Sequence, residues 1–524
     1  MSHGLVFFES GKWGNDMDHP EYVNSMLVPV SPQWTTSEAL MGATYRRYVL
    51  GVSEKSVDRQ DLSHLSQSIP GDSDEKGLWQ SLLSESGGLR SPVLKRETGD
   101  LLQVMPLVPN LAKYGCILGS KSTHRWDPGS LIDSAFRSGT GPAGYDSFIS
   151  DFKDALAVGP DDDLLARFVQ EGLDLGTGTA QPRGPSRETF AWHDGSGSDS
   201  GLPPAERMVR DLRVAIKLKG TLTRRQWTAF LESILRLGLG MHELWLARLN
   251  SQLWEAACVV LDGGEVPSRD AIERWWTSHR DGAGLIELGA PFRTGLSRQI
   301  ARLFQARLGL DLLLSCLDEA GVPTASVLGK PTVEENPKAT TGDSVAVLWS
   351  FLNLVAQQRV HVSGALNAWR EKTGRRAESL RGVANEIADL NQNVARGSAG
   401  FTKNVTEFVV YLLQQLVPLG AEDMAYDQGY VARQRGSSRS PWLACLGPSV
   451  LVFAVHACCS DLGGAAGTLD DLQEYLRDYG IEASMDELQS GQTGLSLVRL
   501  GLVADSPDAT SGRLLVNPFP PSRR

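Results

Sequence analysis

Residues 204–260 have the sequence PAERMVRDLRVAIKLKGTLTRRQWTAFLESILRLGLGMHELWLARLNSQLWEAACVV, which is typical of α-helix over most of its length. Its first residue is a proline, which fits the start of a helix because the missing N–H costs nothing there. Thr223 and Gln226 fit a capping box, in which the two residues satisfy each other's backbone N–H groups. The pattern predicts helices at 205–218, 224–238 and 241–260.

Helical periodicity continues beyond this stretch and dominates the second half of the chain. Toward the N-terminus, short apolar runs mix with turns, which indicates a mixed α/β region. No internal repeat of fixed period occurs, so a solenoid is disfavoured. The predicted fold class is therefore mainly α. Further helices are predicted at 267–279, 295–319, 343–359, 376–395 and 402–417.

The length of the chain predicts a multidomain protein, because 524 residues are too many for one hydrophobic core. The clearest break is a stretch rich in glycine, serine and proline before the helical half. The predicted parts are an N-terminal mixed α/β domain at 1–175, a linker at 176–204, helical domains at 205–335 and 342–436, and a C-terminal domain at 440–524.

Charge limits the partners that the chain can have. A net charge of −11 repels nucleic acid and anionic membranes overall, so any nucleic-acid contact needs a local basic patch. Arginine (38 residues) far outnumbers lysine (13 residues), which we attribute to the codon bias of a GC-rich bacterial genome.

The cysteines and apolar segments predict the compartment. Six cysteines are scattered without a CxxC pair, which indicates free thiols in a reducing environment. The N-terminus lacks the features of a secretion signal. The apolar run at 442–459 is broken by Gly447-Pro448, which favours a buried helix over a membrane span. We therefore expect a cytoplasmic protein without membrane contact.

Residues 442–517 follow the order helix, helix, helix, hairpin. Thr468 with Asp471, and Ser484 with Glu487, predict caps for the second and third helices, and two short apolar strands follow. This order resembles the winged-helix family. The resemblance implies a module whose third helix can lie in the major groove of DNA.

The charges of this module argue against DNA as its partner. Between Thr468 and Asn517 there are nine acidic and three basic residues, and Asp486 and Glu487 stand at the start of the third helix. DNA binding rests on neutralising phosphates with cations. We therefore favour a protein contact for the module, with direct DNA binding as the alternative.

The most basic segment is 207–225, where Arg207, Arg210, Arg213 and Lys217 follow i, i+3, i+6, i+10 spacing and should share one helical face. Three arginines just ahead of the C-terminal module could add to it. A solvated helix face paired with acids elsewhere is the alternative interpretation, and on an acidic protein we favour it. The candidate nucleic-acid-binding residues are Arg207, Arg210, Arg213, Lys217, Lys219, Arg224, Arg225, Arg433, Arg435 and Arg439.

A second basic cluster surrounds Trp369, and cations interleaved with an aromatic ring can hold single-stranded nucleic acid. Glu371 and Glu378 dilute the charge of this cluster, which favours an ordinary surface loop.

Several segments approach a catalytic motif without meeting it. Residues 173–180 (LDLGTGTA) resemble the first motif of class I methyltransferases, but the following QPRGPSRE cannot begin a packed helix. GSKST at 119–123 and LGKPT at 328–332 lack the spacing of a phosphate loop. The nine histidines show no metal-binding spacing. We therefore expect no cofactor and no metal.

These features predict a non-catalytic subunit or adaptor of a bacterial DNA-associated complex, such as an anti-phage defence or DNA-modification system. Its partners would be other protein subunits, with nucleic acid reached through local arginine patches. Two alternatives stay open. One is a DNA-binding regulator that uses 207–225, and the other is an enzyme of unfamiliar type in the N-terminal half.

Overall fold

In the computed structural model of the chain, helices dominate and strands are few and short, so the predicted mainly α class is confirmed. The described residues are 37–51, 72–74, 106–113, 128–140, 142–174, 204–280, 284–300, 302–319, 321–322, 344–373, 376, 378–386, 401–415, 429–434, 440–505 and 513–520. The predicted linker lies outside the described residues apart from its last residue, Pro204.

The longest element is α9 (Arg224–Leu261), a single helix of 38 residues. The two helices predicted at 224–238 and 241–260 are therefore one. It begins at the predicted capping box, in which the Thr223 side chain accepts from the backbone N–H of Gln226 and the Gln226 side chain accepts from that of Thr223.

The glycines in the middle of α9 do not break the helix, because neighbouring elements approach the backbone there. A Cβ atom on Gly238 would lie 2.4 Å from the side chain of Met208, and one on Gly240 would lie 2.6 Å from that of Leu413. Helix propensity alone disfavours glycine at such positions. Tertiary packing therefore overrides the break that the sequence suggested.

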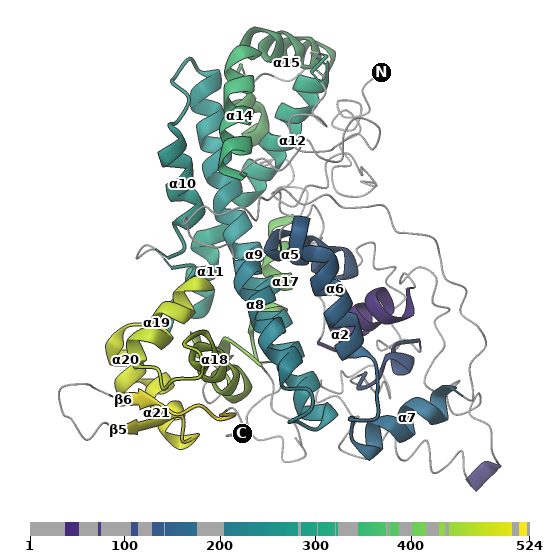
Figure 1. The fold of residues 1–524 in the computed structure, drawn as a ribbon. Helices are drawn as coiled ribbons and strands as arrows, with labels where there is room; N and C mark the ends of the chain where they lie inside the picture. The colour runs from purple at the N-terminus through teal and green to yellow at the C-terminus, as the bar shows by residue number, and fades with distance from the viewer. Residues whose placement is uncertain are drawn as a thin grey trace.

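Other helices pack around α9 along its length (Figure 1). One end of the molecule holds α10 (Arg269–Thr277), α12 (Leu303–Glu319), α14 (Ser344–Gln357) and α15 (Arg359–Thr373). The elements α11 (Phe292–Ile300) and α17 (Phe401–Leu413) pack on α9, and residue 302 lies in a turn between α11 and α12, so the helix predicted at 295–319 is divided. The described part of the helix predicted at 376–395 is helical over 380–386.

The other end of the molecule holds α8 (Pro204–Lys217), with the N-terminal helices on one side and the C-terminal elements on the other (Figure 1). The N-terminal elements are α2 (Ser37–Tyr45), the π-helix η1 (Arg46–Leu50), the 3₁₀-helix η3 (Pro109–Lys113), α5 (Pro128–Thr140), α6 (Pro142–Leu156) and α7 (Leu164–Asp174).

The described residues before Asp174 contain no strand, so the mixed α/β character predicted for this region is not found in them. The apolar Leu107 and Val108 are buried, but they precede a 3₁₀-helix and do not join a sheet. The carbonyl of Leu107 instead accepts hydrogen bonds from the Tyr45 hydroxyl (3.1 Å) and from Arg224 Nε (3.0 Å). Side-chain donors have taken the place of a neighbouring strand.

The described strands form three short pairs, one of which joins distant parts of the chain. The parallel pair β1 (Ile286–Glu287) and β4 (Ile481–Glu482) links the middle of the chain to its C-terminal part. The pair β2 (Ala432–Gln434) and β3 (Trp442–Ala444) is antiparallel. The third pair, β5 (Val503–Asp505) and β6 (Arg513–Leu515), is also antiparallel and is the predicted hairpin.

The C-terminal module, residues 448–520, contains α18 (Pro448–Asp461), α19 (Leu469–Asp478), α20 (Met485–Gln489) and α21 (Gln492–Arg499), followed by β5 and β6. The capping box of Thr468 and Asp471 is present at the start of α19, as predicted. Just ahead of α19, Thr468 also forms an antiparallel bridge with Leu514 of β6.

The helix predicted after Ser484 is divided into α20 and α21. Ser484 accepts from the backbone N–H of Glu487, which is half of the predicted box. The Glu487 carboxylate reaches forward instead and accepts from the backbone N–H and the hydroxyl of Thr493, both at 2.8 Å. It thereby holds the first turn of α21 against α20.

Buried apolar side chains form one continuous cluster that runs from Leu40 in α2 to Leu515 in β6. The predicted domain boundaries remain predictions, but the described parts of all four predicted domains contribute to this cluster. Within the described residues, no helix is both long enough and apolar enough to cross a bilayer.

Candidate interaction surfaces

The predicted basic segment is divided between the interior and the surface, and Arg207 lies in the interior with 1% of its side chain exposed. Its guanidinium pairs with Asp211 one turn along α8, and also with Asp461 of α18. It lies over the ring of Tyr475, 4.5 Å from the centroid, and 3.8 Å from a carboxylate oxygen of Asp478. Its charge is thus used to join α8 to the C-terminal module.

Asp211 is the second half of this junction. Its carboxylate accepts hydrogen bonds from the hydroxyls of Tyr475 and Tyr479, both on or next to α19, the latter at 2.7 Å. Burial and the charge of Asp211 raise the pKa of both phenols well above 10, so they remain protonated donors. The C-terminal module is therefore fixed to α8 by a buried polar network as well as by the β1–β4 pair.

Arg224 is also buried, at 2% exposure. Its guanidinium lies over the ring of Trp227, 4.8 Å from the centroid, and pairs with Asp162 at 3.2 Å. It connects the start of α9 to the loop after α6. Its further acceptors are the carbonyls of Leu107, Ala155, Leu156 and Ala157 and the hydroxyl of Tyr45.

The predicted cations that stay exposed on α8 are Arg210, Arg213 and Lys217. Arg210 pairs with Glu206 at 3.4 Å, and Arg213 lies 5.8 Å from the ring centroid of Phe148. Their i, i+3, i+7 spacing places them on one stripe of the helix. Contact with an external phosphate from this segment therefore falls to the stripe and not to the buried arginines.

The remaining candidates are less exposed or not described. Lys219 is half-buried and donates to the Ala157 carbonyl at 2.7 Å, and burial lowers its pKa. Arg225 is half-buried as well, and so is Arg433 in β2. Arg435 and Arg439 lie outside the described residues.

An apolar surface lies on α21, the second half of the predicted third helix, which the winged-helix resemblance would place against DNA and for which the charges favoured a protein contact. Leu495 is 48% exposed and Val498 50% exposed, and Leu500 follows at 39%. Thr493 and Leu497 are buried, so the opposite face of α21 is the one exposed to solvent. The sequence analysis considered the charge of this module and missed its exposed apolar residues, although the i, i+3 spacing of Leu495 and Val498 was readable.

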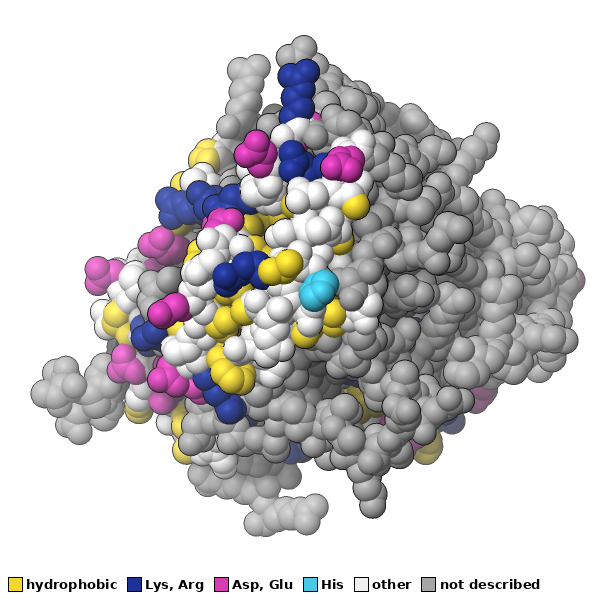
Figure 2. Space-filling model, turned by 90° about the horizontal axis from the view of Figure 1, so that it is seen from above, with side chains coloured by type: hydrophobic (Ala, Val, Ile, Leu, Met, Phe, Trp, Pro, Cys, Tyr) yellow, Lys and Arg dark blue, Asp and Glu magenta, His cyan; other side chains and the backbone are white. Residues whose placement is uncertain are grey.

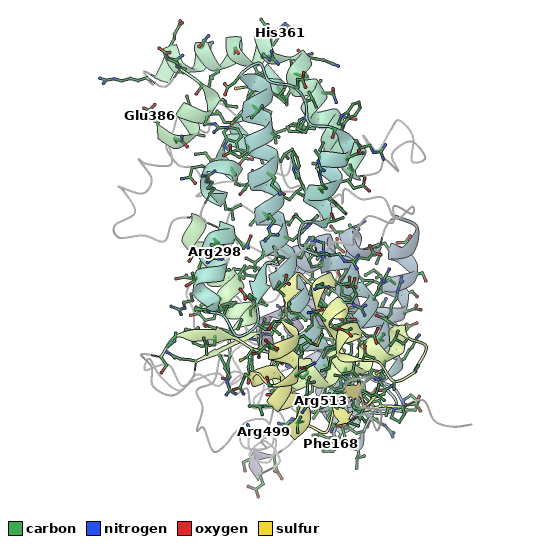
Figure 3. All side chains as sticks on the ribbon, turned by 90° about the vertical axis from the view of Figure 1, so that its left-hand side faces the viewer. Phe168, Arg298, His361, Glu386, Arg499 and Arg513 are labelled. Atoms are coloured by element: carbon green, nitrogen blue, oxygen red, sulfur yellow. The ribbon has the colours of Figure 1, made fainter. Side chains whose placement is uncertain are left out.

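The charged residues near α21 are few. Arg499 is exposed at its end, and Arg513 of β6 donates to the carbonyl of Gln489 at 2.6 Å (Figure 3). Asp486 is exposed on the preceding α20. The surface of α21 is thus an apolar patch with both acidic and basic side chains beside it. Phosphate binding needs a dense group of cations, which this surface lacks.

The N-terminal helices contain a buried cluster of titratable groups around Asp133 of α5. Its carboxylate accepts from the hydroxyls of Tyr48 and Tyr145 and pairs with Arg47 (3.0 Å) and Arg137 (3.1 Å). Burial, followed by the charge of Asp133, raises the pKa of both phenols. The cluster is satisfied internally and serves to hold η1, α5 and α6 together.

Metal and thiol chemistry find little support in the described part of the chain. No group of three or more histidine, cysteine, aspartate or glutamate side chains there could hold a metal ion. The described cysteines are buried free thiols, as the sequence predicted. Burial raises the pKa of Cys258 to about 11 and that of Cys458 to about 12, which makes both weak nucleophiles at neutral pH.

No protein-family model matches this chain, and no curated protein or solved structure matches it either.

Proposed function

We propose that the chain is a non-catalytic adaptor subunit of a bacterial DNA-associated complex, and that its C-terminal module holds another protein subunit through α21. The observation that carries this proposal is the exposed apolar pair Leu495 and Val498, which lie one turn apart on the same face of α21. Exposed apolar residues grouped on one helix face mark contact sites for proteins more often than for phosphates.

The order of elements in the module supports its assignment as winged-helix-like. Three helical segments, α18, α19 and α20–α21, precede the β5–β6 hairpin, and the bridge from Thr468 to Leu514 adds a third strand position. In such a module α21 takes the place of the helix that enters DNA in many relatives of the fold. Here that helix offers leucine and valine, with Asp486 close before it, so a protein groove is the better match.

The rigid attachment of the module also supports an adaptor role. Arg207 and Asp211 on α8 bind α18 and α19 through buried polar contacts, and β1 pairs with β4. A surface fixed in this way presents its partner at a defined position relative to the rest of the chain. An adaptor needs such a fixed surface, because it must hold the partner bound at one end in a defined position relative to what is bound at its other end.

The test is to purify the tagged chain from its own bacterium and to identify the subunits bound at fixed stoichiometry by native mass spectrometry. A double variant, Leu495→Glu with Val498→Glu, should lose a subunit that wild type retains. The matched control is Leu164→Glu on α7, where the side chain is 79% exposed, and it should retain the subunit. If the double variant keeps every wild-type partner, α21 is not the contact site.

A second candidate function, direct binding of duplex DNA, is favoured by the exposed stripe of Arg210, Arg213 and Lys217. Charge reversal of all three should abolish duplex binding at low salt if the stripe carries it. The matched control is charge reversal of Arg167 and Lys153, which are also exposed on helices. Wild-type protein that binds no duplex at low salt would rule this function out.

A further inference from the structure

Two segments far apart in the sequence are basic and free of acidic residues. Residues 288–302 contain three arginines, residues 428–447 contain three more, and neither segment contains aspartate or glutamate. In the whole chain 62 of 524 residues are acidic, and the net charge is −11. Cations without nearby acids in the sequence of an acidic protein indicate a local positive field if the two segments lie together.

The fold does bring the two segments together. The backbone N–H of Gly289 donates to the carbonyl of Ala444 at 2.9 Å, and the N–H of Ala444 donates to the carbonyl of Ala290 at 3.0 Å. The guanidinium of Arg293, at the start of α11, lies 5.8 Å from the ring centroid of Trp442 in β3. The beginning of α11 and the strand β3 therefore share one surface.

Arginines continue from this surface along α11 and past its end. Arg293 and Arg298 are exposed on α11, and Arg302 follows in the next turn with 77% of its side chain exposed. Arg302 lies 3.5 Å from one carboxylate oxygen of Glu255, and Arg381 lies 2.9 Å from the other. The arginine track is defined here as Arg293, Arg298, Arg302 and Arg381.

The track has an excess of positive charge, because its four arginines share one paired acid, Glu255, which leaves a net charge of 4 − 1 = +3. Within the described part of the chain, Arg298 has neither an ion pair nor a hydrogen bond from its side chain. Elsewhere the exposed charges are balanced. Arg210 on α8 pairs with Glu206, and at the end formed by α14 and α15 acidic and basic side chains lie beside one another (Figure 2).

Acidic side chains mark the limits of the track. Glu287 of β1 is exposed two residues before Gly289, and Glu386 lies beyond Arg381. Figure 3 shows Arg298 and Glu386 along the same side of the molecule. Arg433 does not belong to the track, because it is paired with Leu443 across β2 and β3 and so lies on the opposite face of this ribbon from Trp442.

We propose that the arginine track binds the phosphates of single-stranded nucleic acid, with Trp442 stacking on a base at one end. A row of cations next to an aromatic ring is the usual means of holding a single strand. Guanidinium planes can also stack on unpaired bases, which a duplex does not offer. An acidic protein segment would use the charges but has no base for the ring. The proposal does not rest on the α21 contact.

The experiment is fluorescence anisotropy of a labelled oligothymidylate of about 16 nucleotides, at the upper end of known single-strand site sizes, titrated with the full chain. Wild type should bind at low salt. The logarithm of the binding constant falls by about 0.7 per neutralised phosphate for each unit of log salt, so three net charges predict a slope of about −2. A fourfold rise in salt should therefore weaken binding by roughly 20-fold.

The main variant, Arg293→Gln with Arg298→Gln, removes two of the three net charges. It should bind at least roughly tenfold more weakly at low salt, and its salt slope should fall to about −0.7. The matched control, Lys153→Gln with Arg167→Gln, removes two exposed cations from α6 and α7 and should bind as wild type does. Trp442→Leu should weaken binding by roughly tenfold at an unchanged slope, because it removes stacking and no charge.

Four results would overturn the proposal. They are a wild type that does not bind the oligonucleotide at low salt, an arginine variant that binds as wild type does, a control that loses as much affinity, and an arginine variant that loses as much affinity for a duplex as for the single strand. Circular dichroism shows whether each variant is folded, and the arginine variant decides the outcome where Trp442→Leu is not. Leu495→Glu with Val498→Glu should bind the strand as wild type does, which separates this contact from that of α21.

Discussion

Glu243, in the middle of α9, allows a sharp test of the interior of this protein. The residue is 1% exposed, and neither carboxylate oxygen has a hydrogen-bond partner among the described residues. Burial raises the pKa of this carboxyl from 4.5 to about 8. Its neighbour His242 is 2% exposed, and burial lowers the pKa of its imidazole from 6.5 to about 3. Both side chains are therefore neutral at pH 7.

The two residues affect the free energy of unfolding with opposite signs. Between pH 4.5 and 8 the folded state keeps a proton on Glu243 that the unfolded state has lost, so stability falls by about 1.4 kcal/mol per pH unit. Between pH 3 and 6.5 the unfolded state holds a proton on His242 that the folded state lacks, so stability rises at the same rate. The two slopes cancel between pH 4.5 and 6.5.

Replacing Glu243 by glutamine removes the contribution of the Glu243 carboxyl to this pH dependence and leaves that of His242. The free energy of unfolding of Glu243→Gln minus that of wild type should increase by about 1.4 kcal/mol per pH unit from pH 4.5 to 8, and stay level above that. The total, over 8 − 4.5 = 3.5 pH units, is about 5 kcal/mol.

The assay is urea unfolding followed by tryptophan fluorescence at a series of pH values. Taking the difference between variant and wild type cancels the contributions of all other titrating groups. A pH-independent difference for Glu243→Gln would refute the reasoning, because it would mean that the carboxyl ionises as readily in the folded protein as in the unfolded chain.

Three further predictions concern packing and polar contacts. Arg224→Ala should lower the free energy of unfolding by about 3–5 kcal/mol, measured by chemical denaturation, because it leaves buried carbonyls and a carboxylate without their donor. Asp211→Asn should reduce the hydrogen-exchange protection of α19 while α12 keeps its own, and unchanged protection in α19 would contradict the role given to this network. Gly240→Ala should lower the free energy of unfolding by about 1–3 kcal/mol, because its Cβ atom would lie 2.6 Å from the Leu413 side chain. Gly295→Ala in α11, where a Cβ atom meets nothing within 4 Å, should not lower it.

Local signals in the sequence predicted local structure well. The capping box at Thr223 and the one at Thr468 are both present, because a cap depends on residues within one turn. The same reasoning placed a break at Gly238–Gly240 that does not exist. Whether a glycine interrupts a helix or admits a neighbour depends on Met208 and Leu413, which are distant in the sequence.

The position of the arginines on α8 shows a second limit. At 100° per residue, Arg210, Arg213 and Lys217 lie within about 60° of one another around the helix, whereas Arg207 lies about 60–120° away from them. Steps of three residues drift around a helix, so the four do not share a face. The sequence was sufficient to calculate these angles. It could not show that Asp461 and Tyr475 of the C-terminal module contact Arg207.

Charge alone does not distinguish an arginine that binds an external ligand from one that holds the fold together. An acid one turn away is not sufficient either, since the exposed pair of Arg210 and Glu206 has the same spacing as the buried ones. What the buried Arg207, Arg224 and Arg236 share is a partner on another element. Arg236 donates to the carbonyls of Leu412 (2.7 Å) and Gln414 (2.8 Å), at the end of α17. The buried pairs with this spacing are Arg207–Asp211, Glu232–Arg236 and Arg307–Asp311.

A guanidinium suits this task because its fixed fork of five N–H donors can serve a carboxylate and several carbonyls at once. A lysine ammonium has three donors and loses its charge more readily when buried. The excess of arginine over lysine therefore has a structural use in this chain, whatever its origin in codon choice. The cations left for a partner are those that remain exposed to solvent, and on α8 these are Arg210, Arg213 and Lys217.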